Sequence, residues 1–337
     1  MKRILFFCAA LAALALASCN KEPGPSDVTE GKNIEVTVSI QGTPDTRATG
    51  TTYADESKVN SLQVFVFNAD NREAYRSVSG AMSTLVPATS GERTVWAVVN
   101  APDLSSVMTL SGLKDSVSSL ADNSRDSFVM TGSSTLELTD GGNVPITVRR
   151  IVARVSVAKI STDLKDYRQN YSVAVEGIYM INVAASSKYE VGGESIAWAN
   201  KLGHTDAGLD ALLYDKVTGV TVSNGHPYEV EHAFYPYPNI HPQENEAGIF
   251  APEWSPRGSI LVIEATMYEE DGTTGHHGYY PIVLPAIGRN RTYIIEEVCI
   301  TRLPGADPYK PIETGETKVT INVAEWELGL NLGTITI

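Results

Sequence analysis

The sequence has little cysteine. Its 337 residues include only Cys8, Cys19 and Cys299, and the first two lie at the N-terminus, in the leader described below. A chain that has lost this region retains only Cys299, so no internal disulfide can stabilise it. Cys299 lies in the apolar stretch Tyr293–Ile300, where we expect it to be a small buried side chain.

Positive charge is also scarce. The chain has 26 lysines and arginines against 40 aspartates and glutamates, which gives a formal net charge of −14. Binding to nucleic acid needs a basic face that neutralises phosphates, so we expect no nucleic-acid partner. After the leader, no apolar run approaches the length of a membrane-spanning helix.

The sequence lacks the common signatures of catalysis. No nucleophile elbow, P-loop or dinucleotide-binding fingerprint occurs in it. His276 and His277 fall in a predicted turn, and no third ligand follows at a spacing typical of zinc sites. We therefore expect no enzyme, no cofactor and no metal site.

Two groups of residues leave other functions open. A metal cluster could form from His226, His232 and His241 with Glu229 and Glu231, although the Pro- and Tyr-rich surroundings favour a structural loop. A glycan-binding surface could use the stacking faces of Trp198, Trp254, Tyr235 and Tyr237, which core packing would explain as well.

The N-terminus has the features of an export signal. Lys2 and Arg3 precede a short apolar run, and Leu16-Ala17-Ser18-Cys19 ends it. These four residues resemble a bacterial lipobox, in which the cysteine is acylated and becomes the new N-terminus. The lysine two positions after Cys19 does not match the signal for retention in the inner membrane, so we expect an outer-membrane lipoprotein. The polar composition of residues 20–32 predicts a flexible tether.

The next stretch, Asn33–Gly50, combines a strand pattern with a loop pattern. Ile34, Val36, Val38 and Ile40 alternate with polar residues, which predicts a strand with one buried face. Gly, Pro and Asp then mark a loop that contains Arg47 and Ala48. The stretch is either a first strand with a linker or a removable strand with a protease site after Arg47.

Short strands separated by turn signals dominate the remainder, so we predict an all-β protein with two β-sandwiches. The clearest break is Asp140-Gly141-Gly142-Asn143. We expect a signal over residues 1–19, a tether and removable strand over 20–47, and sandwiches over 48–143 and 144–337. The one helical candidate is Leu104–Leu120.

The chain ends on apolar strands. Leu328, Leu330 and Leu332 alternate with small or polar residues, and Ile335 and Ile337 follow in the opposite phase, which predicts a bulge near Gly333. These residues are either ordinary terminal strands of a sandwich or a strand that can pair with another subunit.

Several segments, taken in order, resemble the fimbrillin family, the type V pilins of Gram-negative anaerobes. They are the lipobox ending at Cys19, the strand Asn33–Ile40 with Thr46-Arg47-Ala48, Leu62–Phe67, Trp96–Asn100, Arg150–Val155, Arg291-Thr292-Tyr293 and Val323–Trp326.

The resemblance implies two transthyretin-like Greek-key sandwiches in tandem and export as a lipoprotein through Cys19. It also implies cleavage between Arg47 and Ala48 by an arginine-specific protease. The strand bearing Ile34, Val36, Val38 and Ile40 would leave a groove. A donor strand from another subunit, bearing Leu328, Leu330, Leu332, Ile335 and Ile337, would fill it. The expected partners are other copies or related subunits in a surface fimbrium, with host protein or glycan beyond them.

Three readings without polymerisation stay open: a fimbrial tip adhesin, an anchor that keeps its lipid, and a glycan-binding surface lipoprotein. Thr46-Arg47-Ala48 together with the apolar C-terminus favours the polymerising subunit. Asp115-Ser116-Val117 also resembles a short O-glycosylation motif.

Overall fold

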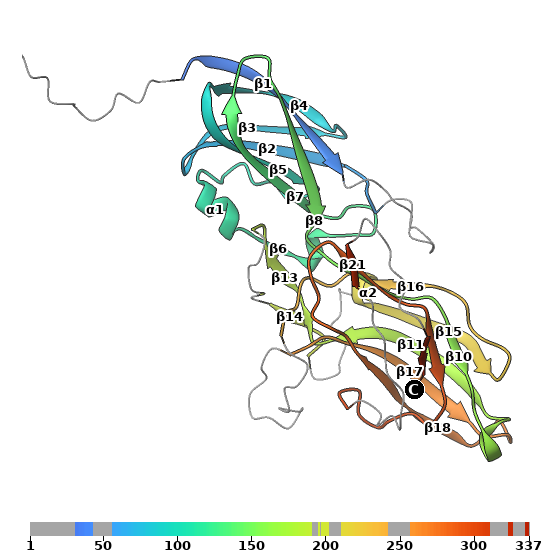
Figure 1. Cartoon of the computed structure of the whole chain (residues 1–337). Helices are drawn as coiled ribbons and strands as arrows, with labels where there is room; N and C mark the ends of the chain where they lie inside the picture. The colour runs from blue at the N-terminus through green and yellow to red at the C-terminus, as the bar shows by residue number, and fades with distance from the viewer. Residues whose placement is uncertain are drawn as a thin grey trace, which may run out of the picture.

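The structure, a computed structural model, describes residues 31–42, 56–190, 195, 197–201, 210–241, 257–310, 323–325 and 334–336. It forms two lobes along one long axis (Figure 1). We call residues 31–150 the N-terminal lobe and the described residues from 151 onward the C-terminal lobe. Strands dominate both lobes, which confirms the prediction of an all-β protein.

One rolled sheet makes up the N-terminal lobe. Its strands lie in the order β3-β2-β5-β7-β8-β1-β4. Their bounds are β1 Asn33–Gly42, β2 Ser61–Asn68, β3 Asn71–Ser79, β4 Ser83–Thr89, β5 Gly91–Val99, β7 Met130–Leu138 and β8 Asn143–Arg150. The inward side chains of these strands form one apolar cluster, because alternate residues of a strand point to the same face.

The break expected between sandwiches at residues 140–143 is a turn within this sheet. β8 begins at Asn143 and pairs with both β7 and β1, so the first sheet continues to Arg150. The composition of residues 140–143 indicates a turn correctly, but a turn between two strands of one sheet has the same composition as a linker.

The predicted helix over Leu104–Leu120 is much shorter in the structure. α1 covers Leu110–Asp115, and the Thr109 side chain caps it by accepting a hydrogen bond from Gly112 N. Ser116 then ends it by donating from its hydroxyl to Gly112 O. The chain continues as β6, Val117–Ser119, and a 3-10 turn η1, Leu120–Asp122. Serine favours caps and turns over helix interiors, which explains the difference.

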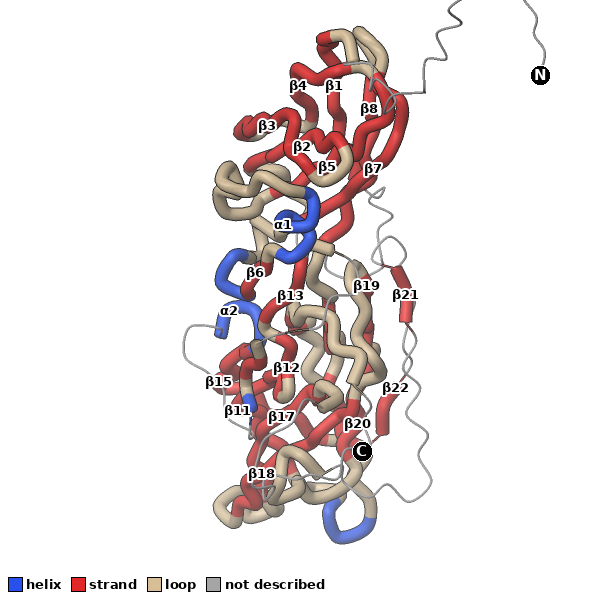
Figure 2. Tube along the Cα trace, turned by 90° about the vertical axis from the view of Figure 1, so that its left-hand side faces the viewer, coloured by secondary structure: helices blue, strands red, loops and turns tan. Residues whose placement is uncertain are grey.

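The C-terminal lobe contains two four-stranded sheets, β15-β11-β17-β18 and β16-β9-β19-β21, and a three-stranded sheet β10-β20-β22. The bounds are β9 Arg154–Val157, β10 Ile160–Thr162, β11 Ser172–Ile181, β15 Tyr214–Ser223, β16 His232–Phe234, β17 Ile260–Tyr268, β18 Gly275–Val283, β19 Arg291–Ile295, β20 Glu297–Ile300, β21 Val323–Glu325 and β22 Thr334–Thr336. The hairpin of β17 and β18 confirms the one predicted on either side of residues 270–275. Figure 2 shows β21 and β22 along one side of this lobe.

Smaller elements complete the lobe. They are β12 Val183–Ala184, β13 Ser186–Lys188, β14 Trp198–Ala199, the 3-10 turn η2 Asp166–Arg168 and α2 Asp210–Leu213. Within the described part of the chain, no helix is long and apolar enough to cross a membrane.

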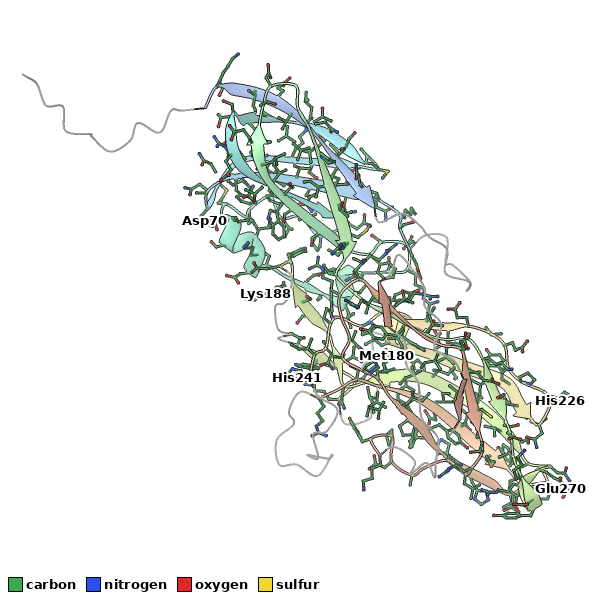
Figure 3. All side chains as sticks on the ribbon, in the orientation of Figure 1. Asp70, Met180, Lys188, His226, His241 and Glu270 are labelled. Atoms are coloured by element: carbon green, nitrogen blue, oxygen red, sulfur yellow. The ribbon has the colours of Figure 1, made fainter. Side chains whose placement is uncertain are left out.

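A continuous core joins the lobes. Phe65, Phe67 and Trp96 of the N-terminal lobe belong to the same buried cluster as Tyr235 and Tyr293 of the C-terminal lobe. The pairing of β6 with β13 also crosses the junction. Lys188 lies there (Figure 3) and its Nζ is 2.7 Å from a carboxylate oxygen of Asp115. The two lobes therefore share apolar contacts, main-chain hydrogen bonds and an ion pair.

Candidate functional site

The first strand lies inside its sheet. β1 pairs in parallel with β8, where Val38 faces Val144, and antiparallel with β4, where Val36 faces Val86. Further main-chain hydrogen bonds, such as Ile40 N to Met82 O at 2.8 Å, hold both of its edges. Because β4 is the last strand in the order, β1 is the element that links β4 to the rest of the sheet.

The four predicted apolar residues of β1 point into the lobe. Ile34, Val36, Val38 and Ile40 are buried in one cluster, and their exposed fractions range from 0% to 5%. Around them in the same cluster lie residues of β4 and β8, namely Val86, Ala88, Val144, Ile146 and Val148. Removal of β1 would therefore expose an apolar floor between two strand edges with unpaired main-chain groups.

The start of this strand is accessible from outside. Asn33, Ile34 and Glu35 line an open cavity of about 550 Å³, together with residues of β3 and β4 and with Asp140. Asp140 Oδ1 accepts a hydrogen bond from Glu35 N at 3.2 Å.

Glu56, the first described residue after the segment 43–55, is anchored at the junction of the lobes. Its Oε1 accepts hydrogen bonds from Arg154 Nε at 3.2 Å and from the Tyr235 hydroxyl at 2.5 Å. Its main-chain oxygen accepts a third bond, from Arg150 Nε at 2.9 Å. The predicted cleavage residues Arg47 and Ala48, like Cys19, lie outside the described residues.

Arg154 is the centre of a buried ionic group. Its Nη2 is 2.7 Å from Glu231 Oε1, so it contacts two carboxylates at once. Burial by itself would lower the pKa of Arg154, but the negative charges of Glu56 and Glu231 outweigh burial and raise it. The pKa of Tyr235 is also raised, chiefly by burial and then by the charge of Glu56.

Sequence reasoning did not identify this group of residues. The available signal was the presence of Arg150 and Arg154 within the apolar stretch 144–160, since charged side chains in a buried strand need partners. The partner Glu56 is 98 positions from Arg154, and no local pattern connects the two.

At the other end of the chain, the structure describes only part of the predicted donor segment. Ile335 lies in β22, whose backbone pairs in parallel with β20 of the same chain, opposite Val298. Leu328, Leu330, Leu332 and Ile337 lie outside the described residues. The exchange of this strand between subunits stays a prediction.

His276 and His277, which the sequence places in a turn without a third metal ligand, have different surroundings in the structure. His276 and His277 lie within β18 and not in a turn, and each imidazole meets a glutamate. His277 Nε2 is 3.1 Å from Glu264 Oε1 and 3.6 Å from Glu176 Oε2, so three possible ligands gather on the surface of the sheet. Glu176 and Glu264 come from two other strands, which is why sequence spacing did not find them.

The other suggested metal cluster, of His226, His232 and His241 with Glu229 and Glu231, does not form among the described residues. His232 contacts Asp215 and Tyr228, and His241 packs against Trp198 with tilted rings, 5.3 Å between ring centroids. Glu231 forms an ion pair with Arg154. Two of the suggested glycan-stacking residues, Tyr235 and Tyr237, are fully buried, so they pack in the core and offer no sugar-binding face. Trp254 lies outside the described residues.

Sequence comparison supports the family suggested by the motifs. The model of the major fimbrial subunit protein (FimA) family matches residues 33–173, which include β1 and its flanking strands. The major fimbrium subunit FimA type-2 of Porphyromonas gingivalis is 29% identical over 220 residues, which cover 58% of this chain and 56% of that protein. The type-3 subunit of the same organism is similar to the same extent. The chain thus matches little more than half the length of these curated relatives.

Solved structures share the fold. A fimbrilin (FimA) from Porphyromonas gingivalis superposes with a TM-score of 0.62 at 20% identity, over 86% of this chain and 95% of that one. The tip fimbrial protein Mfa3 of the same organism gives 0.53 at 15% identity, over 88% of this chain and 100% of that one. A fimbrilin and a tip fimbrial protein therefore share the fold of this chain. Residues 33–173 of this chain are thus similar to the FimA family of major fimbrial subunits.

Proposed function

We propose that this chain is a structural subunit of a surface fimbrium that assembles by exchange of strands. It is exported as an outer-membrane lipoprotein through Cys19 and cut between Arg47 and Ala48 by an arginine-specific protease. Loss of β1 then opens a groove that the C-terminal strand of another subunit fills. In this reading each lobe is a transthyretin-like Greek-key sandwich, and adhesion to host protein or glycan follows from the assembled fibre.

The observation that carries this proposal is the position of β1. It is an interior strand of a sheet, yet it is followed within fourteen residues by the anchored Glu56, so a single cut between them separates it from the chain. Burial of its four aliphatic side chains is worth roughly 6–12 kcal/mol before entropy losses, at about 1.5–3 kcal/mol each. A donor strand that recovers this burial and both sets of main-chain bonds would make a persistent non-covalent link.

The contacts of Glu56 support the site of separation. Glu56 is held by Arg150, Arg154 and Tyr235, none of which lies in β1. A cut before Glu56 therefore frees β1 while the junction of the lobes stays intact. Before the cut, covalent connection gives β1 a high effective concentration at its slot and blocks a competing strand.

Substitution of the cleavage residue tests processing. Arg47→Ala should accumulate the lipidated precursor and reduce fibres, whereas Thr46→Ala should be processed normally. N-terminal sequencing of surface protein should give Ala48. A mature N-terminus elsewhere, or normal fibres from Arg47→Ala, would contradict the proposal. Cys19→Ala should leave the precursor unlipidated and away from the outer membrane.

A disulfide lock tests whether the C-terminal strand moves. Thr336 pairs with Cys299 across β22 and β20. Neighbouring strands lie about 4.8 Å apart, within the Cα range that a disulfide can bridge. Thr336→Cys should therefore form a disulfide with the native Cys299, hold β22 on its own subunit and prevent SDS-resistant ladders until reductant is added. Thr336→Ser is the matched control.

Ladders formed by the oxidised variant, with the disulfide verified by mass, would show that assembly does not need β22 to leave its subunit, and would contradict exchange of this strand. If the reduced variant and Thr336→Ser also formed no ladders, the anchor, tip-adhesin or glycan-binding reading would replace the polymerising subunit. The fold alone does not separate these readings, because the tip protein Mfa3 shares it.

A further inference from the structure

A cavity of about 340 Å³ lies at the junction of the lobes, on the side of the sheet away from the β1 cluster. The N-terminal lobe contributes Trp96 of β5, Thr131 and Ser133 of β7, and Arg149 of β8. The C-terminal lobe contributes Tyr189 and the loop between β18 and β19, which bears Arg289. Two arginines from different lobes therefore line one cavity.

The Arg289 guanidinium is held in place by neutral groups. Its Nη1 donates to the main-chain oxygen of Tyr189 at 3.0 Å, and its Nη2 donates to the Thr131 hydroxyl. Among the residues that the structure describes, the buried Nε of Arg289 has no hydrogen-bond partner. Buried donors are rarely left unsatisfied in native proteins, so this one calls for an acceptor.

The loop that presents Arg289 is well fixed. Asn290 has a φ of 52° and its Oδ1 accepts a hydrogen bond from Arg150 N at 3.0 Å. On the other side, Gly288 N donates to the Tyr293 hydroxyl at 2.7 Å. The position of the guanidinium is therefore set before any ligand arrives, which reduces the entropy lost on binding.

The cavity has an excess of positive charge. In the part of the chain that the structure describes, neither Arg149 nor Arg289 has an ion pair with an acidic side chain. Burial lowers the pKa of Arg289 to about 10, and the nearby charge of Arg149 adds to this effect while Tyr237 opposes it. A buried cation without a counter-charge is costly, and an anion beside it would relieve the cost.

We propose that this cavity is an anion-binding site, in which Arg289 and Arg149 together hold a small oxyanion or a carboxylate group. The guanidinium fork matches two oxygens of one anion, which is the geometry that favours arginine over lysine at such sites. The hydroxyls of Ser133 and Thr147 line the same cavity and supply further donors. Because its two cations come from different lobes, the bound anion also joins the lobes.

Calorimetric titration of the full chain with sodium phosphate, against sodium chloride at equal ionic strength, tests the site. We expect saturable binding of one phosphate per chain. Arg149→Gln and Arg289→Gln should each weaken the affinity by about tenfold or more. Arg149 is exposed, so its variant should fold even if the Arg289 variant does not. The control is Arg76→Gln, which removes the same charge from an exposed position on β3.

Acetate in place of phosphate distinguishes the sources of the anion. Binding of both would indicate a site for a carboxylate group presented by a partner chain, whereas binding of phosphate alone would indicate a free tetrahedral oxyanion. Absence of saturable binding up to about 10 mM of either anion would overturn the proposal. Equal weakening in Arg149→Gln and Arg76→Gln would overturn it as well, because the binding would then reflect net charge.

Discussion

Arg154 forms ion pairs with two buried carboxylates at the junction of the lobes. It contacts Glu56, which follows the predicted cleavage segment, and Glu231, which directly precedes β16. All three side chains are at least nine-tenths buried. Arrangements of this kind depend on every member being present, because each remaining charge is left in a poorly solvated environment.

Arg154→Leu should lower the free energy of unfolding by about 3–5 kcal/mol, because two buried carboxylates lose their common cation. Urea denaturation followed by circular dichroism measures the loss. Lys165→Ala, which breaks the exposed pair with Asp163, should leave the midpoint unchanged. A loss of similar size in both variants would mean that Arg154 contributes no more than a surface ion pair.

At the scale of single elements, β1 combines two properties that seldom occur together. It is buried on one face and paired along both edges, as an interior strand is. It also precedes a segment rich in Gly, Pro and Asp. The first property means that a strand in this slot gains both burial and main-chain pairing. The second places a turn-forming sequence directly after β1, where the proposed cleavage would fall.

Val36→Ala and Val38→Ala should each destabilise the uncleaved chain by about 1.5–3 kcal/mol, because each removes buried methyl groups and leaves a cavity. Glu35→Ala, on the exposed face of the same strand, should change the stability by no more than about 0.5 kcal/mol. Equilibrium unfolding in urea gives the comparison. If the valine variants were as stable as the Glu35 variant, β1 would not contribute to the core.

At the scale of the whole molecule, buried tyrosines are spread through the core of the C-terminal lobe and the junction. The pKa of each of five hydroxyls is raised, with burial as the largest cause at every one: Tyr179, Tyr189, Tyr235, Tyr237 and Tyr280. Burial disfavours the charged phenolate, so the folded chain keeps these protons to a higher pH than the unfolded chain.

Stability should therefore fall as the pH rises above about 10, the ordinary pKa of tyrosine. Below that pH both states keep the protons and the contribution is fully present; above it the unfolded state binds fewer protons, so unfolding becomes easier. In an alkaline titration followed by tyrosinate absorbance, the buried tyrosines should ionise at a higher pH than the exposed ones. Their ionisation should coincide with the loss of the circular dichroism signal of the folded chain. Complete titration near pH 10 without unfolding would show that these hydroxyls are accessible.

Local patterns were sufficient for much of the fold and for part of the site. Alternation in residues 34–40 predicted both the strand and its buried face, because the two-residue period of a strand is a property of the backbone itself. The hairpin around residues 270–275 was predictable for the same reason. The helix over Leu104–Leu120 was overestimated, since apolar spacing does not show where a serine will cap or end a helix.

The sequence by itself determined the all-β class, the first strand and its inward residues, because these depend on neighbours along the chain. Only the tertiary structure decided that β8 and β4 flank that strand, that Glu56 meets Arg154, and that Arg149 and Arg289 share a cavity. Such contacts join residues between about 50 and 140 positions apart, as the 98 positions between Glu56 and Arg154 illustrate. They arise from the way sheets roll and lobes pack, and strand periodicity carries no information about partners at that distance.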